Sequence, residues 1–398
     1  MKVITDKNKI EEVFRRGEVV EVLPSKDEFV RKLMNGERLR MYIGFDATST
    51  SLHLGHAKNI MFMEELRQLG HEIIILFGDF TARIGDPSDK GATRKQLTKE
   101  QVEQNVSGWL EQVKHLINFD DSENPARIEY NSKWLSKLTL ENVVDLASNF
   151  TVQQMLERDM FQKRLASNAP IHLHEFLYPL MQGYDSVAMD VDVEVCGTDQ
   201  TFNALAGRTL QKRLKDKDKF VVALNLIANP RTGELMSKSN GTGVFINLPP
   251  KEMFGAIMSL PDPMIDPLYI YCTRLPLEDK KSFDDLGPRK AKARLAHEIV
   301  KKFHGEKRAD EAEQAFDSTF AKGEMPEDVA EISIASGKNV ADLLIEHRII
   351  PSKAEWKRLI DGDAVRDEND NKISDYGFVP EKTTILKIGK RRFVKFIV

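Results

Sequence analysis

The chain carries the segment MYIGFDATSTSLHLGH at residues 41–56, and its architecture follows from this segment. The apolar start predicts a buried strand, and the apolar positions after His56 recur at helical spacing until Gly70. A strand, a Thr/Ser-rich turn and a helix are therefore expected in that order. His53 and His56 lie in the first turn of the helix, where unpaired N–H groups and the helix dipole favour a phosphate.

The two histidines alone are weak evidence for a nucleotide site, because histidines near a helix start are more often caps or surface residues. Gly55 lies between them and allows a flat ring or a backbone to approach closely. No third His, Cys or carboxylate lies at ligand spacing nearby, so we expect no metal site here.

The composition is that of an ordinary globular protein. The 398 residues are enough for two or three domains, and 41% of them are apolar and 30% charged. A net charge of -4 means that any nucleic acid must bind through local basic patches. Two cysteines, a charged N-terminus without an apolar core and the absence of a long apolar run predict a cytoplasmic protein with no membrane span.

Further strands are predicted along the first 250 residues. A continuous apolar run at residues 72–77 ends in a Gly/Asp/Pro loop, and later strands are expected at 127–130, 191–195 and 220–224. Helices are expected at 1–38, 96–119, 138–149, 152–166, 171–186 and 201–214. This alternation predicts an α/β fold with a Rossmann-like, doubly wound parallel sheet, where ligands bind at the carboxyl ends of the strands.

The pattern divides the chain into three parts. Residues 1–249 form the Rossmann-like domain with a helical insertion at about 95–190. Residues 250–330 are helical and rich in charge, and residues 324–337 read as a linker or short connecting element. Residues 336–398 form a small α+β module with two short helices and a turn-rich β segment.

A second motif lies far downstream, in the loop at residues 229–243. Lys238 follows Met236 and Ser237 there and is surrounded by serine and glycine, so the loop could close and bring an ammonium group onto a phosphate. Alone, a solvated turn lysine would be the better interpretation. Together with the histidine motif, and without any G-x-x-x-x-G-K-[ST] segment, the loop indicates a triphosphate site of another kind.

These two motifs resemble the signatures of class I aminoacyl-tRNA synthetases, H-I-G-H and K-M-S-K-S. They stand here as His53-Leu54-Gly55-His56 and Leu235-Met236-Ser237-Lys238-Ser239. The first lysine of the second signature is Leu235 in this chain, so its contribution to phosphate binding is absent or supplied elsewhere.

Within that class the resemblance narrows to the tyrosyl-tRNA synthetases and runs from about residue 36 to the C-terminus. It rests on motifs that follow in the same order. Besides the two signatures, they are YIGFD at 42–46, GDPS at 85–88, YPLMQGYD at 178–185 and GTDQ at 197–200. Tyr178, Gln182 and Asp185 also fall on one face of a helix. Their apolar neighbours predict that the helix is buried, and buried polar groups need partners such as an amino-acid substrate.

The resemblance implies a role for individual residues. Tyr42 and Asp185 would bind the phenolic hydroxyl of tyrosine; Asp86, Tyr178 and Gln182 its ammonium group; Gln200 its carboxylate; and Asp46 would lie near the amino acid and its adenylate. Gly55, His56, Gly197, Asp199 and Met236 would contact the nucleotide, Thr48 and His53 the γ-phosphate, and Lys90, Arg94 and Lys238 the leaving pyrophosphate.

The implied reaction activates L-tyrosine with ATP, accompanied by Mg²⁺, and transfers the tyrosyl group to tRNA(Tyr), with no tightly bound cofactor. The family also implies a homodimer with the insertion around 135–170 at its interface. The C-terminal module resembles an S4-type RNA-binding domain, in which a basic patch of Lys353, Lys357, Arg358, Arg391 and Arg392 would bind the RNA backbone.

Three alternatives stand beside this interpretation. A tryptophanyl-tRNA synthetase shares the fold and both signatures, although a Tyr/Asp pair suits a phenol better than an indole N–H. A relative that has lost catalysis could use the fold as an RNA-binding scaffold. A nucleotidyltransferase with the same histidine motif would leave the C-terminal module unexplained.

Overall fold

The computed structural model describes residues 2–86, 97–236, 243–321, 330–334, 339–347, 349–367, 371–380, 382–389 and 392–397. The chain forms two compact units, Met1–Glu313 and Gln314–Val398. These two units do not test the predicted division of the chain into three parts, which stays a prediction.

A six-stranded sheet in the order β1-β6-β5-β2-β3-β4 forms the centre of the first unit. Its strands are β1 (Val19–Leu23), β2 (Arg40–Asp46), β3 (Glu72–Gly78), β4 (Arg127–Tyr130), β5 (Val193–Gly197) and β6 (Phe220–Leu224). All neighbours pair in parallel except β1, which runs antiparallel to β6 at the edge. The strand order reverses between β2 and β5, and this is the point at which doubly wound sheets bind ligands.

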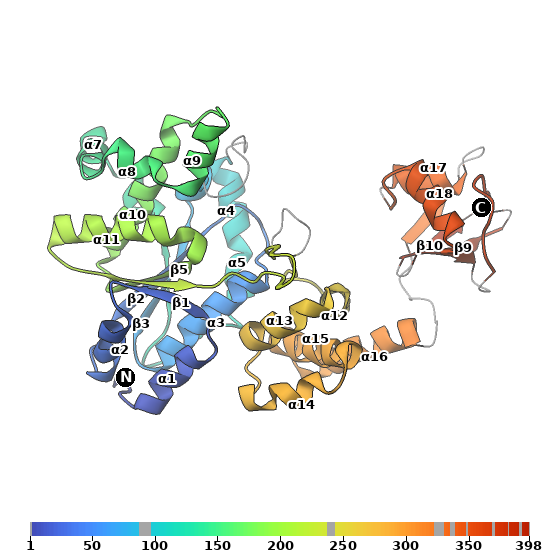
Figure 1. Ribbon diagram of the computed structural model, residues 1–398, viewed down its shortest axis with the longest axis horizontal. Coiled ribbons are helices and arrows are strands. Elements are labelled where there is room, and N and C mark those ends of the chain that lie inside the picture. Colours follow the sequence, from blue (N-terminus) through green and yellow to red (C-terminus); the bar gives the residue numbers. More distant parts are fainter. Residues whose placement is uncertain are drawn as a thin grey trace. The chain divides into compact units, whose positions relative to one another are not determined.

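Helices cover both faces of this sheet (Figure 1). The pair α10 (Leu177–Met189) and α11 (Thr201–Lys215) lies on one face, and α3 (Leu54–Gln68) lies on the other together with α1 (Lys7–Arg15) and α2 (Lys26–Met34). Because both faces are covered, the central strands are mostly apolar, and every residue of β6 is buried.

The remaining helices of the chain's first 321 residues come from the insertion and from the segment after the sheet. The insertion contributes α4 (Lys99–Ser107), α5 (Trp109–Val113), α6 (Ser132–Leu135), α7 (Leu140–Ala147), α8 (Val152–Leu156) and α9 (Asp159–Ala166). After β6 come α12 (Pro250–Ser259), α13 (Ile265–Cys272), α14 (Lys280–Asp284), α15 (Pro288–His304) and α16 (Glu306–Ala321). None of the described helices combines the length and the apolar character that a membrane crossing needs.

Within its described residues, the second unit contains a four-stranded sheet in the order β7-β10-β9-β8, the end of α16 and two further helices. Its elements are β7 (Ala330–Ser333), α17 (Val340–Glu346), α18 (Lys353–Asp361), β8 (Val365–Asp367), β9 (Thr384–Ile388) and β10 (Arg392–Ile397). Trp356 of α18 is 2% exposed in its apolar core, and its indole N–H donates to the carbonyl oxygen of Tyr376 at 2.9 Å.

The fold class predicted from sequence is confirmed, and three local predictions were wrong. Residues 1–38 were expected to be helical, but they contain the strand β1 between two helices. This strand forms because it pairs with β6 at the edge of the sheet, a contact that the local sequence does not show. The expected connecting element at 324–337 contains β7, whose partner β10 lies more than sixty residues further on. The expected helix at 96–119 is divided into α4 and α5, with Gly108 as the C-cap of α4.

We expect Trp356→Ala to lower the stability of the second unit by about 3–5 kcal/mol, because the substitution removes a large buried ring and leaves a cavity. Urea unfolding followed by limited proteolysis should show early cleavage within Gln314–Val398. Lys357→Ala, on an exposed position of the same helix, is the matched control and should unfold as the wild type does. Equal stability of the two variants would contradict the assigned core.

Candidate active site

A cavity of about 360 Å³ opens at the carboxyl ends of β2 and β5, where the strand order reverses. Every predicted pocket residue that lies within the described part of the chain lines this cavity. They are Tyr42, Asp46, Thr48, His53, Gly55, His56, Asp86, Tyr178, Gln182, Asp185, Gly197, Asp199, Gln200 and Met236. Lys90, Arg94 and Lys238 lie outside the described residues. Leu235, which stands in place of the first signature lysine, also lines the cavity.

The first turn of α3 holds its two histidines in a defined protonation state. His53 is the N-cap, and its Nδ1 accepts from the Gly55 N–H at 3.1 Å, while His56 Nδ1 accepts from the His53 N–H at 3.2 Å. Burial lowers the pKa of His53 to about 4 and that of His56 well below 6.5. Both rings are therefore neutral at pH 7 and carry their hydrogen on Nε2, which makes Nε2–H a donor suited to a phosphate oxygen.

The floor of the cavity is a buried carboxylate next to a buried phenol. Asp185 on α10 is 2% exposed and accepts from the Trp134 indole N–H at 2.7 Å and from the Asn131 amide at 3.3 Å. Burial raises the pKa of Asp185 well above 3.8. Tyr42 on β2 is 1% exposed, and its hydroxyl lies 3.0 Å from the Ser186 hydroxyl. Such groups favour a ligand that brings a polar atom of its own.

A second carboxylate, Asp46, ends β2 and is held from two sides. Thr81 donates to one of its oxygens at 2.6 Å, and the Tyr178 hydroxyl donates to the other at 2.8 Å. Gly78 is required beside it, because any Cβ at that position would overlap the Asp46 carboxylate. Burial, and next the charge of Asp46, raise the pKa of Tyr178 well above 10, so the phenol stays protonated and remains a donor.

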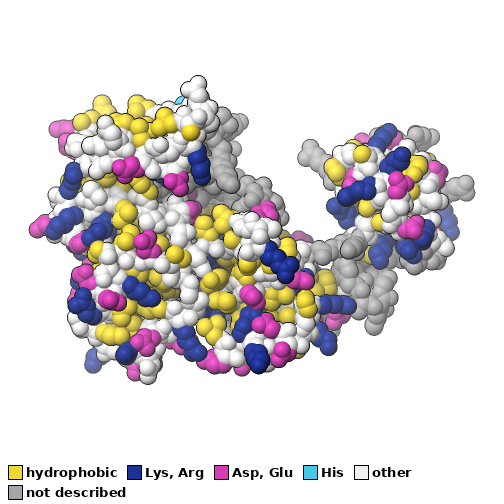
Figure 2. Space-filling view, viewed as in Figure 1, with side chains coloured by type: hydrophobic (Ala, Val, Ile, Leu, Met, Phe, Trp, Pro, Cys, Tyr) yellow, Lys and Arg dark blue, Asp and Glu magenta, His cyan; other side chains and the backbone are white. Residues whose placement is uncertain are grey.

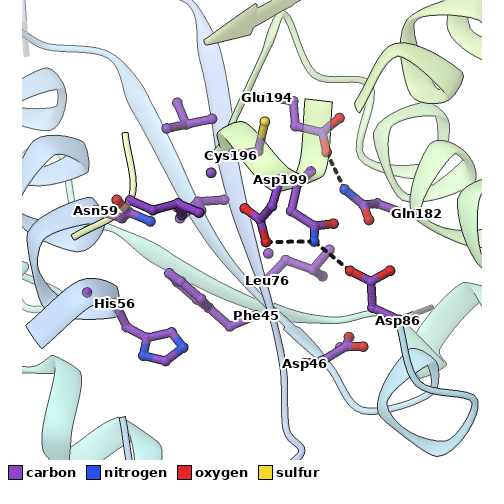
Figure 3. Close-up of a pocket in the computed structure, with 18 of the residues that line it drawn as sticks. Phe45, Asp46, His56, Asn59, Leu76, Asp86, Gln182, Glu194, Cys196 and Asp199 are labelled. Atoms are coloured by element: carbon purple, nitrogen blue, oxygen red, sulfur yellow. Dashed lines mark hydrogen bonds between the residues drawn. The ribbon is translucent and has the colours of Figure 1, made fainter. Parts of the chain in front are cut away.

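Acidic and amide side chains from different segments meet across the cavity mouth (Figure 3). Gln200 donates to Asp86 at 2.5 Å and to Asp199 at 3.3 Å. The Arg158 guanidinium lies 3.6 Å from the Asp86 carboxylate, and its carbon lies 5.7 Å and 5.2 Å from the ring centroids of Phe161 and Phe202. The negative charge of Asp86 and Asp199 suits a ligand with an ammonium group or ribose hydroxyls.

Several residues around the cavity were missed in the sequence. Asn131 and Trp134 follow β4 directly, so the rule that ligands bind beyond strand ends could have found them. Glu194 is a charged residue inside a buried strand, which is a visible signal. Arg158 and Ser186 carry no such signal.

The predicted RNA-binding residues fall on the second unit. Lys353, Lys357 and Arg358 are exposed on α18, where Lys353 pairs with Asp342 at 2.8 Å and Arg358 with Glu355 at 2.8 Å. Arg392 begins β10 and donates to the carbonyl oxygen of Ile349 at 2.6 Å, and Arg391 lies outside the described residues. The roles of these residues, like those of the cavity residues, stay predictions.

Comparison with known proteins gives the class of enzyme first. A family model described as tRNA synthetases class I (W and Y) matches residues 34–321, a range that contains the whole cavity. The sheet, the cavity at its switch point and this match together define a class I aminoacyl-tRNA synthetase.

Individual relatives then distinguish tyrosine from tryptophan. A tyrosine–tRNA ligase 2 of Vibrio parahaemolyticus is 41% identical over 392 residues, which cover 96% of this chain and 97% of the relative. A tyrosine–tRNA ligase of Carboxydothermus hydrogenoformans is 40% identical over 406 residues and covers 97% of each chain. The chain belongs to the tyrosine–tRNA ligase family, and neither the tryptophan alternative nor an inactive scaffold is favoured.

Solved structures show the same fold at lower identity. A C-terminally truncated mitochondrial tyrosyl-tRNA synthetase of Aspergillus nidulans matches with a TM-score of 0.66 at 22% identity, covering 79% of this chain and 95% of that chain. A tyrosyl-tRNA synthetase of Archaeoglobus fulgidus complexed with L-tyrosine matches with a TM-score of 0.58 at 22% identity, covering 76% and 99%.

The neutral histidine cap predicts a specific loss of stability in acid. Because the pKa of His53 is about 4 in the folded chain and 6.5 is its ordinary value, acidification through this range protonates the unfolded chain first and favours unfolding. His53→Asn keeps a good N-cap but removes the titrating group. Between pH 7 and pH 5, the wild type should lose about 2 kcal/mol more than the variant in urea unfolding. Equal losses would contradict the assigned state of His53.

Proposed function

We propose that the cavity between β2, β5 and α10 is where this ligase activates L-tyrosine with ATP. The products are tyrosyl-adenylate and pyrophosphate, and the tyrosyl group then passes to the 3′ end of tRNA(Tyr) as AMP leaves. One observation carries the proposal: a buried carboxylate and a buried phenol, Asp185 and Tyr42, face the same small cavity. A substrate hydroxyl pairs with both, which a purely apolar side chain cannot do.

The amino-acid end of tyrosine is assigned to the acidic side of the cavity. Asp86, Tyr178 and Gln182 would hold the ammonium group, and Gln200 would place the carboxylate. The hydrogen bond from Gln200 to Asp86 supports this assignment, because it brings the proposed partners of the ammonium group and of the carboxylate side by side. Asp46 would lie beside the reacting carboxylate, with its two oxygens restrained by Thr81 and Tyr178.

The nucleotide is assigned to the other side, at the start of α3. Gly197 and Asp199 would contact the ribose, Gly55, His56 and Met236 the rest of the nucleotide, and Thr48 and His53 the γ-phosphate. Neutral Nε2–H donors at a helix N-terminus support this assignment. Lys90, Arg94 and Lys238 are proposed to neutralise the leaving pyrophosphate.

The chemistry needs position and charge stabilisation but no covalent protein nucleophile. The tyrosine carboxylate attacks the α-phosphorus, its bond to phosphorus forms as the bond to pyrophosphate breaks, and the electron pair leaves with pyrophosphate. Each donor that meets charge developing in the transition state contributes about 3 kcal/mol, or about a hundredfold in rate.

Mg²⁺ is proposed to accompany the ATP phosphates as part of the substrate. Asp46 and Asp86 already accept hydrogen bonds from neighbouring side chains. These carboxylates are therefore engaged by the protein, and the phosphates of ATP would supply the main ligands of the ion. Mg²⁺ is commonly bound through substrate phosphates and water with few protein ligands.

The cytoplasmic location expected from the composition stays a prediction.

Binding of tRNA(Tyr) is assigned to the helices after β6 and to the second unit. The exposed basic residues of α18 support a contact with the RNA backbone. Two of the three pair with acidic neighbours, so their attraction to phosphate is reduced until those pairs exchange. The resemblance of the second unit to an S4-type domain stays part of this proposal.

A homodimer is proposed through the insertion. Five large apolar side chains there are strongly exposed: Leu140 (80%), Val144 (58%), Val152 (65%), Leu165 (51%) and Leu173 (80%). Figure 2 shows yellow side chains along the edge of the molecule formed by α7–α9. Exposed apolar area of this kind within one segment of the chain is typical of an interface with another chain.

The activation step is tested by ATP–pyrophosphate exchange with tyrosine, phenylalanine and tryptophan in parallel. We expect exchange with tyrosine alone, and Asp185→Ala should lower kcat/KM for tyrosine by about tenfold to a hundredfold, because it removes a buried partner of the phenol. Asp284→Ala, an exposed carboxylate on α14, is the control and should behave as wild type. Exchange driven equally well by phenylalanine or tryptophan would overturn the assignment of the cavity floor.

The dimer is tested by light scattering on a size-exclusion column. The wild type should elute with twice the chain mass of 45.3 kDa, and Val144→Asp should elute as a monomer because it places a charge within the apolar face. Leu110→Asp, at an exposed position of α5 outside the insertion's apolar set, should remain dimeric. A monomeric wild type at micromolar concentration would sink this part of the proposal.

A further inference from the structure

A buried ion pair lies behind the cavity floor, among residues that the family motifs do not include. Lys219, just before β6, pairs with Glu194 on β5, and the two side chains are 0% and 2% exposed. The Lys219 ammonium also donates to the Ser186 hydroxyl of α10 at 2.8 Å. Burying two charges costs desolvation free energy unless their hydrogen-bonding groups are satisfied, so this ion pair indicates a specific role.

The ion pair is connected to two of the residues assigned to tyrosine. One oxygen of Glu194 accepts from the Gln182 amide at 2.9 Å, and the two side chains are drawn in contact in Figure 3. The other oxygen of Glu194 accepts from the Ser186 hydroxyl at 3.2 Å. Ser186 is in turn 3.0 Å from the hydroxyl of Tyr42, which is paired in register with Glu194 across β2 and β5.

The helix packing leaves room for this arrangement only because α11 has a glycine. A Cβ at Gly207 would lie 2.6 Å from the Lys219 ammonium and 2.8 Å from the Ser186 hydroxyl. On α10, a Cβ at Gly183 would lie 3.1 Å from the Gly207 nitrogen, so the two helices touch through their glycines. The close approach of α10 and α11 therefore brings Ser186 within reach of the ion pair.

The Tyr42 hydroxyl is held by both Ser186 and Glu194. An ammonium group can only donate and a carboxylate can only accept, whereas either hydroxyl of the Tyr42–Ser186 pair can be the donor. Burial, and next the charge of Glu194, raise the pKa of Tyr42 well above 10, so the phenol keeps its hydrogen. Lys219, Glu194 and Ser186 thereby fix where the Tyr42 hydroxyl lies at the cavity floor.

We propose that Lys219, Glu194 and Ser186 are positioning residues that hold the Tyr42 hydroxyl in place for the substrate hydroxyl and also hold Gln182 in place. This inference rests on the proposed tyrosine site. A Tyr42 hydroxyl held at the cavity floor favours a ligand that carries a hydroxyl of its own, as a phenol does and a phenyl ring does not. The ion pair thereby contributes to tyrosine specificity without touching the substrate.

The test is a double-mutant cycle of Ser186→Ala and Tyr42→Phe, read by pyrophosphate exchange. Ser186→Ala keeps both members of the ion pair but removes the hydroxyl that joins them to Tyr42. We expect it to raise KM for tyrosine about five- to tenfold and to lower the preference for tyrosine over phenylalanine by a similar factor. KM for ATP should change by less than about twofold, because the nucleotide side is untouched. In the Tyr42→Phe background, Ser186→Ala should have no further effect on tyrosine.

Two controls separate the possible failures. Ser282→Ala removes an exposed hydroxyl that donates to a helix carbonyl at 2.8 Å and should leave all constants unchanged. If Tyr42→Phe leaves KM for tyrosine unchanged, the tyrosine site itself is misassigned. If Tyr42→Phe raises this KM but Ser186→Ala does not, or if the two effects multiply in the double variant, the positioning role is overturned and the site assignment stands. A parallel rise in KM for ATP would indicate general damage and would also overturn it.

Discussion

Polar groups buried around the cavity in the parallel sheet constrain this structure more than any other feature. Asp46 ends β2, Glu194 is the second residue of β5, and Asp185 and Tyr42 line the same cavity. Each must find a partner in a region that excludes water, because an unsatisfied buried polar atom is costly. The chain supplies some of these partners from α10 and from the residue before β6. We propose that tyrosine supplies the rest, so the same groups that restrict the packing also select the substrate.

Local structure and chemistry coincide at the start of α3. The side chain of His53 caps the helix and that of His56 accepts from the His53 backbone, so each ring uses its Nδ1 for the fold and keeps Nε2–H for a ligand. Their depressed pKa values follow from the burial that closes the cavity. A donor fixed in this way needs little reorganisation when charge develops on a phosphate, which is the condition for electrostatic catalysis.

The sequence allowed the fold class and most of the cavity to be predicted, because both depend on local order. Strand, Thr/Ser-rich turn and helix follow each other within residues 41–70, and Tyr178, Gln182 and Asp185 share a helix face by spacing alone. The missed parts depend on contacts between distant segments. The strand β1 is stabilised by pairing with β6, some two hundred residues later in the chain. The role proposed for Ser186 depends on its contacts with Lys219 and Glu194, which only the folded chain brings together. The residues next to Ser186 in the sequence do not predict these contacts.

The central claim is that the cavity floor requires a hydroxyl on its ligand. Calorimetric titration of the wild-type protein with L-tyrosine and with L-phenylalanine, without ATP, measures this requirement directly. The rejection of phenylalanine by tyrosyl-tRNA synthetases is itself a known example of the principle that a site built for a hydroxyl is left unpaired without one. We predict that phenylalanine binds at least about a hundredfold more weakly than tyrosine, since both Tyr42 and Asp185 lose a partner. Equal affinity for the two amino acids would contradict the account.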